Sequence, residues 1–504
     1  MSQPEALRHR RARAFVIAAV LALFGCSFAA VASSASSRAA KTASPPVEKT
    51  AVEDGSSAVD ASAASAPAGG SDASESAAAE GEAIVDDDAA AATSTSVPSS
   101  STTTSAPSTT QSPPRPATGA PSAAPALQLP EVTPPPVPAG PVYDVPTSID
   151  PTGSVDVTAE LLAFIASVPD GSIIRFPAGA TYRAEGSLRI ENRNNLVFEG
   201  NGATVIADST ADRNRRHWWF VGGSNITIRD LGVRGANPNA GTSEAAYVAS
   251  LEAQHGFEFA GVIGVLLERA RVTDVYGDFV YLGPGAGRWS QNVVIRDSHF
   301  ERNGRQGVAV TGARDVLITG NFISHTRRAT FDLEPNGSGW GASNIQIVGN
   351  QIGPGRLLFV AAVGSPSGLV SDVLVKDNTL SGRAMNITVG GAPLPAELRR
   401  SNFVVVGNRS DTGWGNPGGS LMSFSGIDGV VVSGNVQPLQ RGRGNAGVGV
   451  TYSCDVRVEG NTFTNAIEEL RQDDWSCDPN AEWRTLTREE LIRRAAEQGI
   501  ELHI

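Results

Sequence analysis

The chain has 504 residues, an excess of acidic over basic residues that gives a formal net charge of -12, and three cysteines. Binding of nucleic-acid phosphates needs a concentrated basic face, so this charge argues against nucleic acid as a partner. Three cysteines cannot form a disulfide framework, and no Cys/His cluster with the spacing of a zinc site is present.

The N-terminus has the layout of an export signal. Four arginines between positions 8 and 13 precede an apolar run from Ala14 to Ala32, which predicts that residues 1–32 are a secretory signal peptide or a membrane anchor. Ala30-Val31-Ala32 fits a cleavage site, whereas the residues that end in Cys26 loosely resemble a lipobox, in which Cys26 would be lipidated. Cys26 can also be an ordinary small residue of the apolar run. We therefore expect a protein that is secreted or anchored at the outer face of the cell membrane.

Residues 33–141 contain no aromatic residue and are dominated by Ala, Ser, Thr, Pro and acidic residues. Such a composition offers little apolar surface to offset chain entropy, so we predict a disordered linker. The fold is expected to begin at 142. A short amphipathic helix is predicted from Asp156 to Val168, because Leu161, Leu162, Phe164 and Ile165 recur with helical spacing before a Pro-Asp-Gly stop.

After a first strand at 173–176, the chain repeats itself. Short apolar strands headed by Asn, Asp or Gly recur, and each repeat lacks a helix. Repeats of this length cannot bury a face alone and must stack on copies of themselves. The strands begin at Asn195, Asn225, Gly264, Asn292, Asp315, Asn344, Asp372, Asn402, Gly429 and Asp455, with spacings between 23 and 39 residues.

These repeats resemble the right-handed parallel β-helix of the pectate-lyase-like superfamily, from about Asp156 to Phe463. The resemblance implies an all-β solenoid of about ten coils over 142–481, with an N-terminal capping helix. Stacked Asn amides are expected to bond along one corner, where the preceding residue needs a positive φ. These corner pairs are Gly320-Asn321, Gly349-Asn350, Asp377-Asn378, Gly407-Asn408, Gly434-Asn435 and Gly460-Asn461.

The last part of the chain changes period. Thr487 and Glu490 form a capping box before Leu491 and Ile492, so a C-terminal helix within 482–504 is expected to cover the open end of the solenoid. Cys454 and Cys477 lie at this end of an exported chain, where either one disulfide or two free thiols would fit.

The candidate site follows from laying the strands over one another. If Val308 and Val310 point inward, Phe331 and Leu333 take the same places one coil later, and Asp332 and Glu334 share the outer face. With Asp278 on a neighbouring coil, these carboxyl groups are the predicted catalytic residues. The same three are oxygen ligands that could bind calcium, although no calcium-binding motif is present, and no metal site is predicted.

The predicted substrate-binding residues are outward or corner neighbours of these carboxyl groups. Arg305 and Arg328 are assigned to clamping acidic or hydroxyl groups, and Tyr281 offers a flat surface for sugar rings. Glu258 and Gln306 complete the set. Trp218, Trp219 and Trp289 are expected in loops that flank an open groove, while His299 and His325 are interpreted as surface residues.

We expect an extracellular polysaccharide-acting enzyme, a lyase or a hydrolase, because the resemblance implies acidic residues and an arginine on the outer face of one stacked sheet. The sequence lacks the paired-Asp and Gly-His motifs of polygalacturonases and the Asp-Pro-His-Asp run of alginate epimerases. A non-catalytic surface protein that binds a glycan or cell-wall polymer is the alternative, and a purely structural spacer is a third possibility. The expected partner is a polysaccharide or cell-wall glycan, and the expected state is a monomer.

Overall fold

The computed structural model describes residues 129–335, 340–361, 369–390, 400–472 and residue 493. The chain divides into two compact units, and every described residue lies in the second, Pro121–Ile504. The predicted signal or anchor over 1–32 and most of the linker lie outside the described residues. No helix among the described residues is long and apolar enough to cross a membrane.

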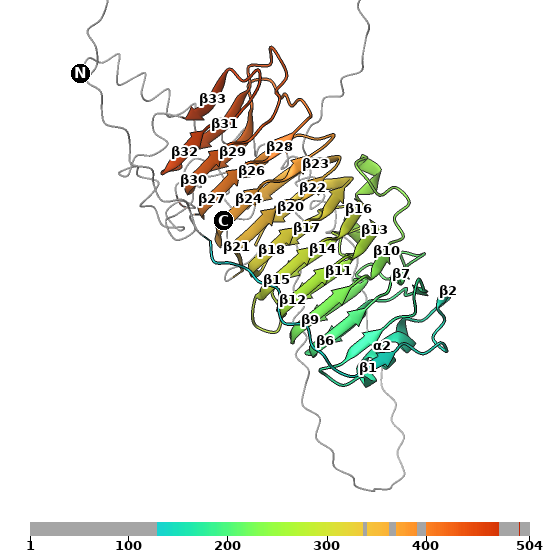
Figure 1. Ribbon diagram of the computed structural model, residues 1–504. Helices are drawn as coiled ribbons and strands as arrows, with labels where there is room; N and C mark the ends of the chain where they lie inside the picture. The colour runs from blue at the N-terminus through green and yellow to red at the C-terminus, as the bar shows by residue number, and fades with distance from the viewer. Residues whose placement is uncertain (1–128, 336–339, 362–368, 391–399, 473–492, 494–504) are drawn as a thin grey trace, which may run out of the picture. The chain divides into compact units, whose positions relative to one another are not determined.

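Three parallel sheets form the described unit, and the chain visits them in turn, so that each turn of the chain makes one coil (Figure 1). The first, sheet A, has 12 strands in the order in which they stack. These strands are β1 (Val142–Asp144), β3 (Ile173–Arg175), β6 (Asn194–Glu199), β9 (Ser224–Arg229), β12 (Ile263–Glu268), β15 (Ser290–Arg296), β18 (Ala313–Thr319), β21 (Gly341–Val348), β24 (Leu369–Lys376), β27 (Arg400–Val406), β30 (Ile427–Ser433) and β32 (Val456–Glu459).

Sheet B has ten strands of two to five residues. They are β2 (Thr152–Asp156), β4 (Thr181–Arg183), β7 (Thr204–Ile206), β10 (Gly232–Arg234), β13 (Arg271–Val275), β16 (His299–Asn303), β19 (Phe322–Ser324), β22 (Gln351–Ile352), β25 (Thr379–Leu380) and β28 (Arg409–Ser410).

Sheet C has 11 strands and carries the candidate site. They are β5 (Leu188–Glu191), β8 (Trp218–Val221), β11 (Phe257–Ala260), β14 (Val280–Gly283), β17 (Val308–Val310), β20 (Thr326–Leu333), β23 (Gly355–Ala361), β26 (Ile387–Val389), β29 (Ser420–Ser425), β31 (Ala446–Thr451) and β33 (Glu468–Gln472). The predicted solenoid of about ten coils is therefore confirmed.

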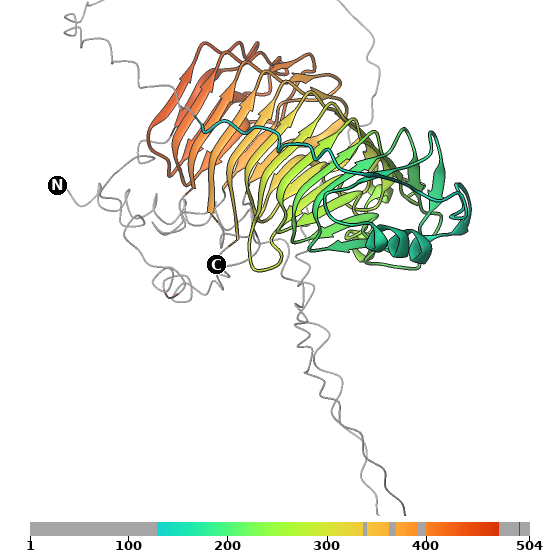
Figure 2. The same ribbon diagram turned by 60° about the horizontal axis from the view of Figure 1, so that its bottom comes forward.

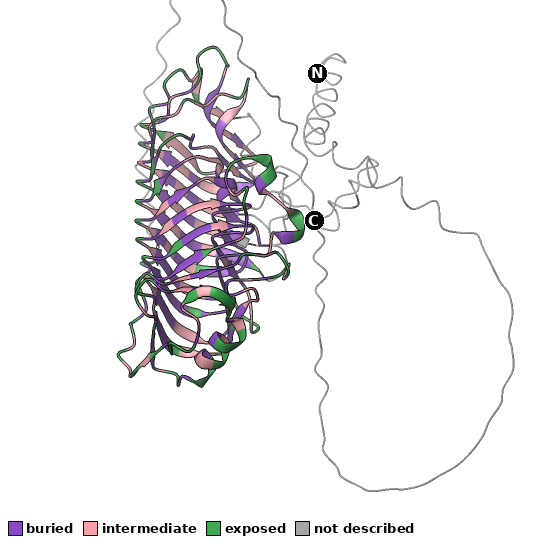
Figure 3. Cartoon of the chain, turned by 90° about the vertical axis from the view of Figure 1, so that its right-hand side faces the viewer, coloured by how far each residue is buried: buried purple, intermediate pink, exposed green. Residues whose placement is uncertain are grey.

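The core is the inside of the solenoid, where buried side chains from all three sheets meet (Figure 3). Alternate residues of each strand point inward, so one apolar side chain stacks on the equivalent side chain of the next coil. Phe220 and Phe259, for example, stack with ring centroids 5.3 Å apart. Because every strand pairs with both neighbours, only the two ends of the stack have free edges.

Asparagines form a continuous ladder at the corner between sheets A and B, as predicted. Each side-chain Nδ2 donates to the Oδ1 of the next asparagine at 2.9–3.0 Å, from Asn321 through Asn350, Asn378, Asn408 and Asn435 to Asn461. The residue before each ladder asparagine has a positive φ, for example 66° at Gly320 and 53° at Asp377. Glycine and aspartate tolerate this conformation better than most residues, which explains the Gly-Asn pairs.

The residues that head the strands of sheet A also have a positive φ, for example 59° at Asn225 and 57° at Asp315. Some of their side chains bond from coil to coil, as Asn344 does to Asp315 at 2.9 Å. The recurrence of Asn, Asp and Gly at these positions therefore has a backbone cause.

The predicted N-terminal helix is α2 (Thr158–Ser167), which buries Leu161 and Ile165 against the first coils. Two short 3-10 helices follow later, η1 (Glu244–Ala246) and η2 (Ala249–Leu251). The predicted C-terminal helix lies outside the described residues apart from residue 493. Cys454 is disulfide-bonded, and its predicted partner Cys477 also lies outside the described residues.

The described residues begin at 129, earlier than the predicted boundary at 142. Residues 129–141 run across the strands of sheet A on its outer face (Figure 2). The carbonyl of Pro130 accepts a bond from Gln346 Nε2 at 2.8 Å, and Val132 packs on Leu266 and Val294. The linker composition gave no sign of this contact, because few side chains hold the segment and the carbonyls of Pro130 and Pro141 make its bonds to the solenoid.

Candidate functional site on sheet C

Residues 235–256 connect β10 to β11 and form a long excursion, hereafter the covering segment. It contains η1 and η2 and reaches across several coils beside the start of the sheet C strands. The backbone N–H of Gly241 donates to the carbonyl of Asn303 at 2.9 Å, and Glu244 forms ion pairs with Arg327 and Arg356. The segment therefore forms a wall beside the predicted site.

The predicted register of sheet C is confirmed. Glu258, Tyr281, Ala309 and Asp332 pair in succession through β11, β14, β17 and β20, while the residues that flank Asp332, Phe331 and Leu333, are buried in the core. The four residues thus form one column on the outer face of the sheet.

Half of the side chains that were predicted to line a groove are buried in the structure. Asp278 is 0% exposed, Asp332 2%, Gln306 5% and Glu258 6%. Four other side chains are half-buried, namely Tyr281, Arg305, Arg328 and Glu334. What the structure offers is a buried charged cluster with a half-exposed margin.

Asp278 lies at the centre of this cluster, and both of its carboxyl oxygens accept a hydrogen bond. Its Oδ2 accepts from Arg305 Nη1 at 2.8 Å and its Oδ1 accepts from the backbone N–H of Gln306 at 2.8 Å. Burial raises the pKa of Asp278 to about 6, although the Arg305 charge opposes this shift. Arg305 also contacts Glu252 of the covering segment at 3.3 Å, so its guanidinium already holds two carboxyl groups of the protein, and its role as a substrate clamp stays a prediction.

Gln306 likewise serves the fold. Its side-chain Oε1 accepts from the backbone N–H of Ala329 at 2.6 Å, and its carbonyl accepts from Asn303 Nδ2. The side-chain Oε1 of Gln306 therefore serves a bond between coils, and the assignment of this residue to substrate binding stays a prediction.

His255 supports Tyr281 and has a defined tautomer. The backbone N–H of Asp278 donates to His255 Nδ1 at 3.0 Å, so this nitrogen carries a lone pair and the ring is neutral with its proton on Nε2. Burial also holds the pKa of His255 well below its usual value. The imidazole stacks on Tyr281 at 4.8 Å, and the Tyr281 oxygen accepts from Thr311 Oγ1 at 2.9 Å.

Among the described carboxyl groups, Asp332 is the one with an unbonded buried oxygen, although several buried arginine, tryptophan and hydroxyl groups also have an atom without a partner. Its Oδ1 is buried and has no hydrogen-bond partner among the described residues. Burial, followed by the charge of Glu334, raises the pKa of Asp332 well above its usual value, and the charge of Arg305 opposes this shift. This shift favours the protonated form of the carboxyl group.

Glu334 and Arg328 lie at the margin of the cluster. Glu334 follows the end of β20, two residues beyond Asp332, and is half-buried. The Arg328 guanidinium lies 4.9 Å from the ring centroid of Tyr247, which belongs to the covering segment. These two side chains, with Tyr281 and Arg305, make up the half-exposed margin.

The remaining predicted residues divide between the core and the outer face. Glu258 accepts from Arg216 Nε at 2.8 Å, and Trp219 lies between Arg216 and Arg189, whose guanidinium carbons are 4.8 and 4.2 Å from its ring centroid. Trp218 is in β8 and is fully buried in the core, so its prediction as a loop residue is wrong. Trp219 is in the same strand, and Trp289 lies between β14 and β15.

Sequence reasoning missed the contribution of the covering segment, namely Tyr247, Glu252 and His255. One signal could have found it: the spacing of 39 residues between Asn225 and Gly264 is the longest in the repeat. Among the described residues, no group of three or more His, Cys, Asp or Glu is placed to hold a metal ion. Asp278, Asp332 and Glu334 therefore do not form a calcium site in the geometry described.

Residues 248–471 match the family model of the right-handed β-helix region. The three stacked parallel sheets agree with this match and give the described unit a parallel β-helix fold. No curated protein matches the sequence significantly.

Solved structures that resemble the chain come from proteins with different roles. The Streptococcus pneumoniae surface protein and adhesin PfbA is 14% identical, with 66% of this chain and 99% of that chain covered and a TM-score of 0.47. The Yersinia enterocolitica family 28 exopolygalacturonase is 12% identical, with 66% and 76% covered and a TM-score of 0.44. For the Azotobacter vinelandii mannuronan C-5 epimerase AlgE6 A-module, identity is 17%, coverage 65% and 95%, and TM-score 0.41. Similarity at this level carries no argument about activity or substrate.

Proposed function

We propose that the protein is an extracellular enzyme that cleaves glycosidic bonds of a polysaccharide, with Asp332 as the general acid. The observation that carries this proposal is the buried Asp332 carboxyl group, which has a raised pKa and an Oδ1 without a hydrogen-bond partner among the described residues. An unpaired buried carboxyl group is costly for the fold, and such groups concentrate at functional sites.

A protonated carboxyl group can donate its proton to the oxygen of a leaving sugar. Glu334 is the nearest carboxyl group along the strand, and alternate residues of a strand lie roughly 6.6 Å apart. Carboxyl groups that keep this backbone spacing lie near the lower end of the range of roughly 6.5–9.5 Å between the carboxyl groups of inverting glycosidases, and farther apart than the roughly 5–5.5 Å of retaining enzymes. We therefore assign Glu334 as the base that activates water, and we expect inversion at the anomeric carbon.

Arg305 and Asp278 position these groups and do not react themselves. The ion pair between them is buried and fixes the corner at which the neighbouring strand begins. Nearby carboxylates raise the pKa of Arg305 above its usual value, so it remains charged and is unsuitable as a base. Its charge lies close enough to Asp332 to oppose the rise in the pKa of that group.

Burial of the cluster favours a second candidate, a non-catalytic protein that binds a glycan or wall polymer. The covering segment occupies one side of the cluster through the contacts of Glu252 and Tyr247. A glycan would then contact only the half-exposed margin, that is Tyr281, Arg305, Arg328 and Glu334. Asp332 would be a buried structural group.

The two candidates differ in product formation. The full chain is incubated with uronate-rich and neutral polysaccharides at several pH values, with and without calcium, and is assayed for new reducing ends and for unsaturated sugars. A hydrolase yields reducing ends alone, whereas a lyase also yields unsaturated ends. Asp332→Asn and Glu334→Gln are expected to remove the product, and Asp144→Asn, at an exposed carboxylate in β1, serves as the matched control. Binding without product under every condition would overturn the enzymatic proposal.

A further inference from the structure

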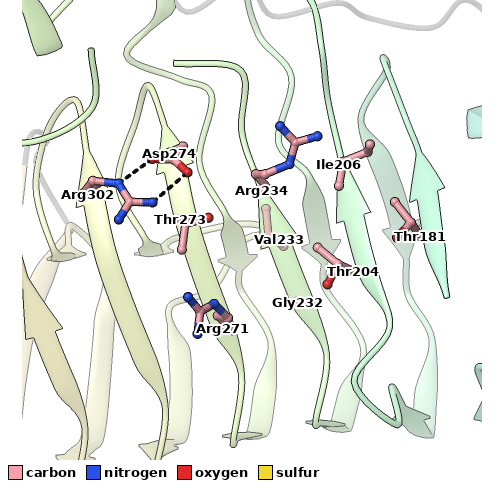
Figure 4. Close-up of a pocket in the computed structure, with 10 residues that line it drawn as sticks. All are labelled: Thr181, Thr204, Ile206, Gly232, Val233, Arg234, Arg271, Thr273, Asp274 and Arg302. Atoms are coloured by element: carbon pink, nitrogen blue, oxygen red, sulfur yellow. Dashed lines mark hydrogen bonds and ion pairs between the residues drawn. The ribbon is translucent and has the colours of Figure 1, made fainter. Parts of the chain in front are cut away.

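The outer face of sheet B carries a hollow of ≈ 500 Å³ that is separate from the sheet C cluster (Figure 4). It lies across β4, β7, β10 and β13, and its lining combines threonines with three arginines, Arg234, Arg271 and Arg302. This hollow lies on a different face from Asp332, and a role for it does not depend on the proposed enzymatic activity.

Glycine at position 232 creates the depression. One outward column of sheet B runs Thr204, Gly232, Arg271 and His299 through successive coils. A Cβ added at Gly232 would lie 2.6 Å from Thr204 Oγ1, closer than non-bonded atoms approach. The Thr204 hydroxyl therefore leans over the gap and is placed to bond with a ligand in it.

Two of the three arginines around the hollow are paired with acidic residues, and the third, among the described residues, is not. Arg302 binds Asp274 through two nitrogens, at 2.8 and 3.1 Å, and Arg234 binds Asp208 at 3.2 Å. Arg271 is exposed and has no ion pair or side-chain hydrogen bond within the part of the chain that the structure describes. Arg302 also lies 3.7 Å from Glu301. The lining itself contains three arginines and one aspartate, and of these described residues Arg271 is the arginine without a paired acid, on a chain whose net charge is -12.

A guanidinium group presents paired N–H donors that match the two oxygens of a carboxylate. Neutral hydroxyls such as those of Thr204 and Thr273 suit the hydroxyl groups of a sugar. One coil beyond Arg271, the His299 ring stacks on Phe322 at 4.7 Å, and both residues are half-buried. Flat rings beside polar donors are a surface on which sugar rings pack.

We infer that the outer face of sheet B binds an acidic oligosaccharide, with a uronate carboxylate on Arg271 and its sugar over Gly232. The chain of the oligosaccharide then runs along the column toward His299, parallel to the solenoid axis. Coils rise by roughly 4.8 Å, so a ligand of three or four sugars reaches from Thr204 to Phe322.

The test uses the full chain with Asp332→Asn, so that any enzymatic activity does not consume the ligand. Isothermal titration with tetragalacturonate measures its affinity for this chain and for the same chain with Arg271→Ala. Loss of a charge-assisted bidentate contact is expected to weaken binding by about tenfold or more. The carboxyl-reduced tetrasaccharide is expected to show no binding at this site.

Arg409→Ala is the matched control, because Arg409 is an exposed arginine in the same column of sheet B, beyond Thr379. It should leave the affinity unchanged. The inference is overturned if Arg271→Ala binds as tightly as its parent, if Arg409→Ala weakens binding equally, or if inorganic sulfate competes as well as the tetrasaccharide. Binding that survives Arg271→Ala would be assigned to another face, and the sheet C proposal would be unaffected.

Discussion

The ladder corner and the outer face of sheet C both hold polar side chains away from water, but they satisfy them differently. In the ladder, Asn378 Oδ1 accepts from both the backbone N–H and the side chain of Asn350, and its own Nδ2 donates to Asn408 and to the carbonyl of Ile347. On sheet C, Asp332 Oδ1 has no partner among the described residues. Other buried side chains, such as Tyr182 and Arg383, also have an unbonded atom, but Asp332 is the only described carboxyl group that does. A buried group without its hydrogen bonds calls for an explanation, and for a carboxyl group we look for that explanation in function.

The largest expected effect comes from removing the acid on sheet C. Asp332→Asn keeps the shape of the side chain but cannot donate a proton to a leaving sugar. Turnover should fall by about 10²–10⁴, the usual contribution of general acid catalysis. The measurement is the initial rate of reducing-end release from the most active substrate. Full activity in Asp332→Asn would show that Asp332 belongs to the fold alone.

In the asparagine ladder, the expected effect of a substitution is on stability and not on turnover. Asn378→Ala removes the acceptor of the buried Asn350 backbone N–H and the side-chain donor to the Ile347 carbonyl, while Asn350 Nδ2 keeps its bond to the carbonyl of Ile318. We therefore expect the free energy of unfolding to fall by about 3 kcal/mol. Urea denaturation followed by circular dichroism measures the change.

Asn461→Ala is the control for the ladder, since Asn461 lies at its end and is half-buried. Its loss should be about 1 kcal/mol. Equal losses at Asn378 and Asn461 would contradict the view that saturation of the buried rungs stabilises the solenoid.

The smallest expected effect concerns the covering segment. Glu252→Gln removes the charge that faces Arg305 but keeps an oxygen for the hydroxyl of Tyr247, which donates to Glu252 at 2.8 Å. Partly exposed ion pairs contribute little, so a loss of about 0.5–1 kcal/mol in urea denaturation is expected. A loss of several kcal/mol would mean that the covering segment is an integral part of the solenoid.

The solenoid and the sheet C register could be predicted because each coil repeats the same constraints. Alternation of inward and outward residues places Asp332 in the column of Tyr281, and the positive φ before each ladder asparagine selects glycine or aspartate. The covering segment has no such periodicity, and its contacts join Glu252 to Arg305 over a long sequence separation. The burial of Asp332 and the use of Gln306 within the fold could not be predicted for that reason.

The most direct test of the central claim compares the unfolding free energies of the wild-type chain and Asp332→Asn at pH 4 and pH 8. The folded-state pKa of Asp332 lies above its unfolded value, so its stabilising contribution is complete below about pH 4 and is lost as the pH rises through the folded pKa. Asparagine does not titrate, and Asp278 shifts in the same way in both proteins. We predict similar stabilities at pH 4 and a more stable Asp332→Asn chain at pH 8, by about 1–3 kcal/mol. A less stable Asp332→Asn chain at pH 8 would contradict the claim that this carboxyl group is kept at the expense of stability.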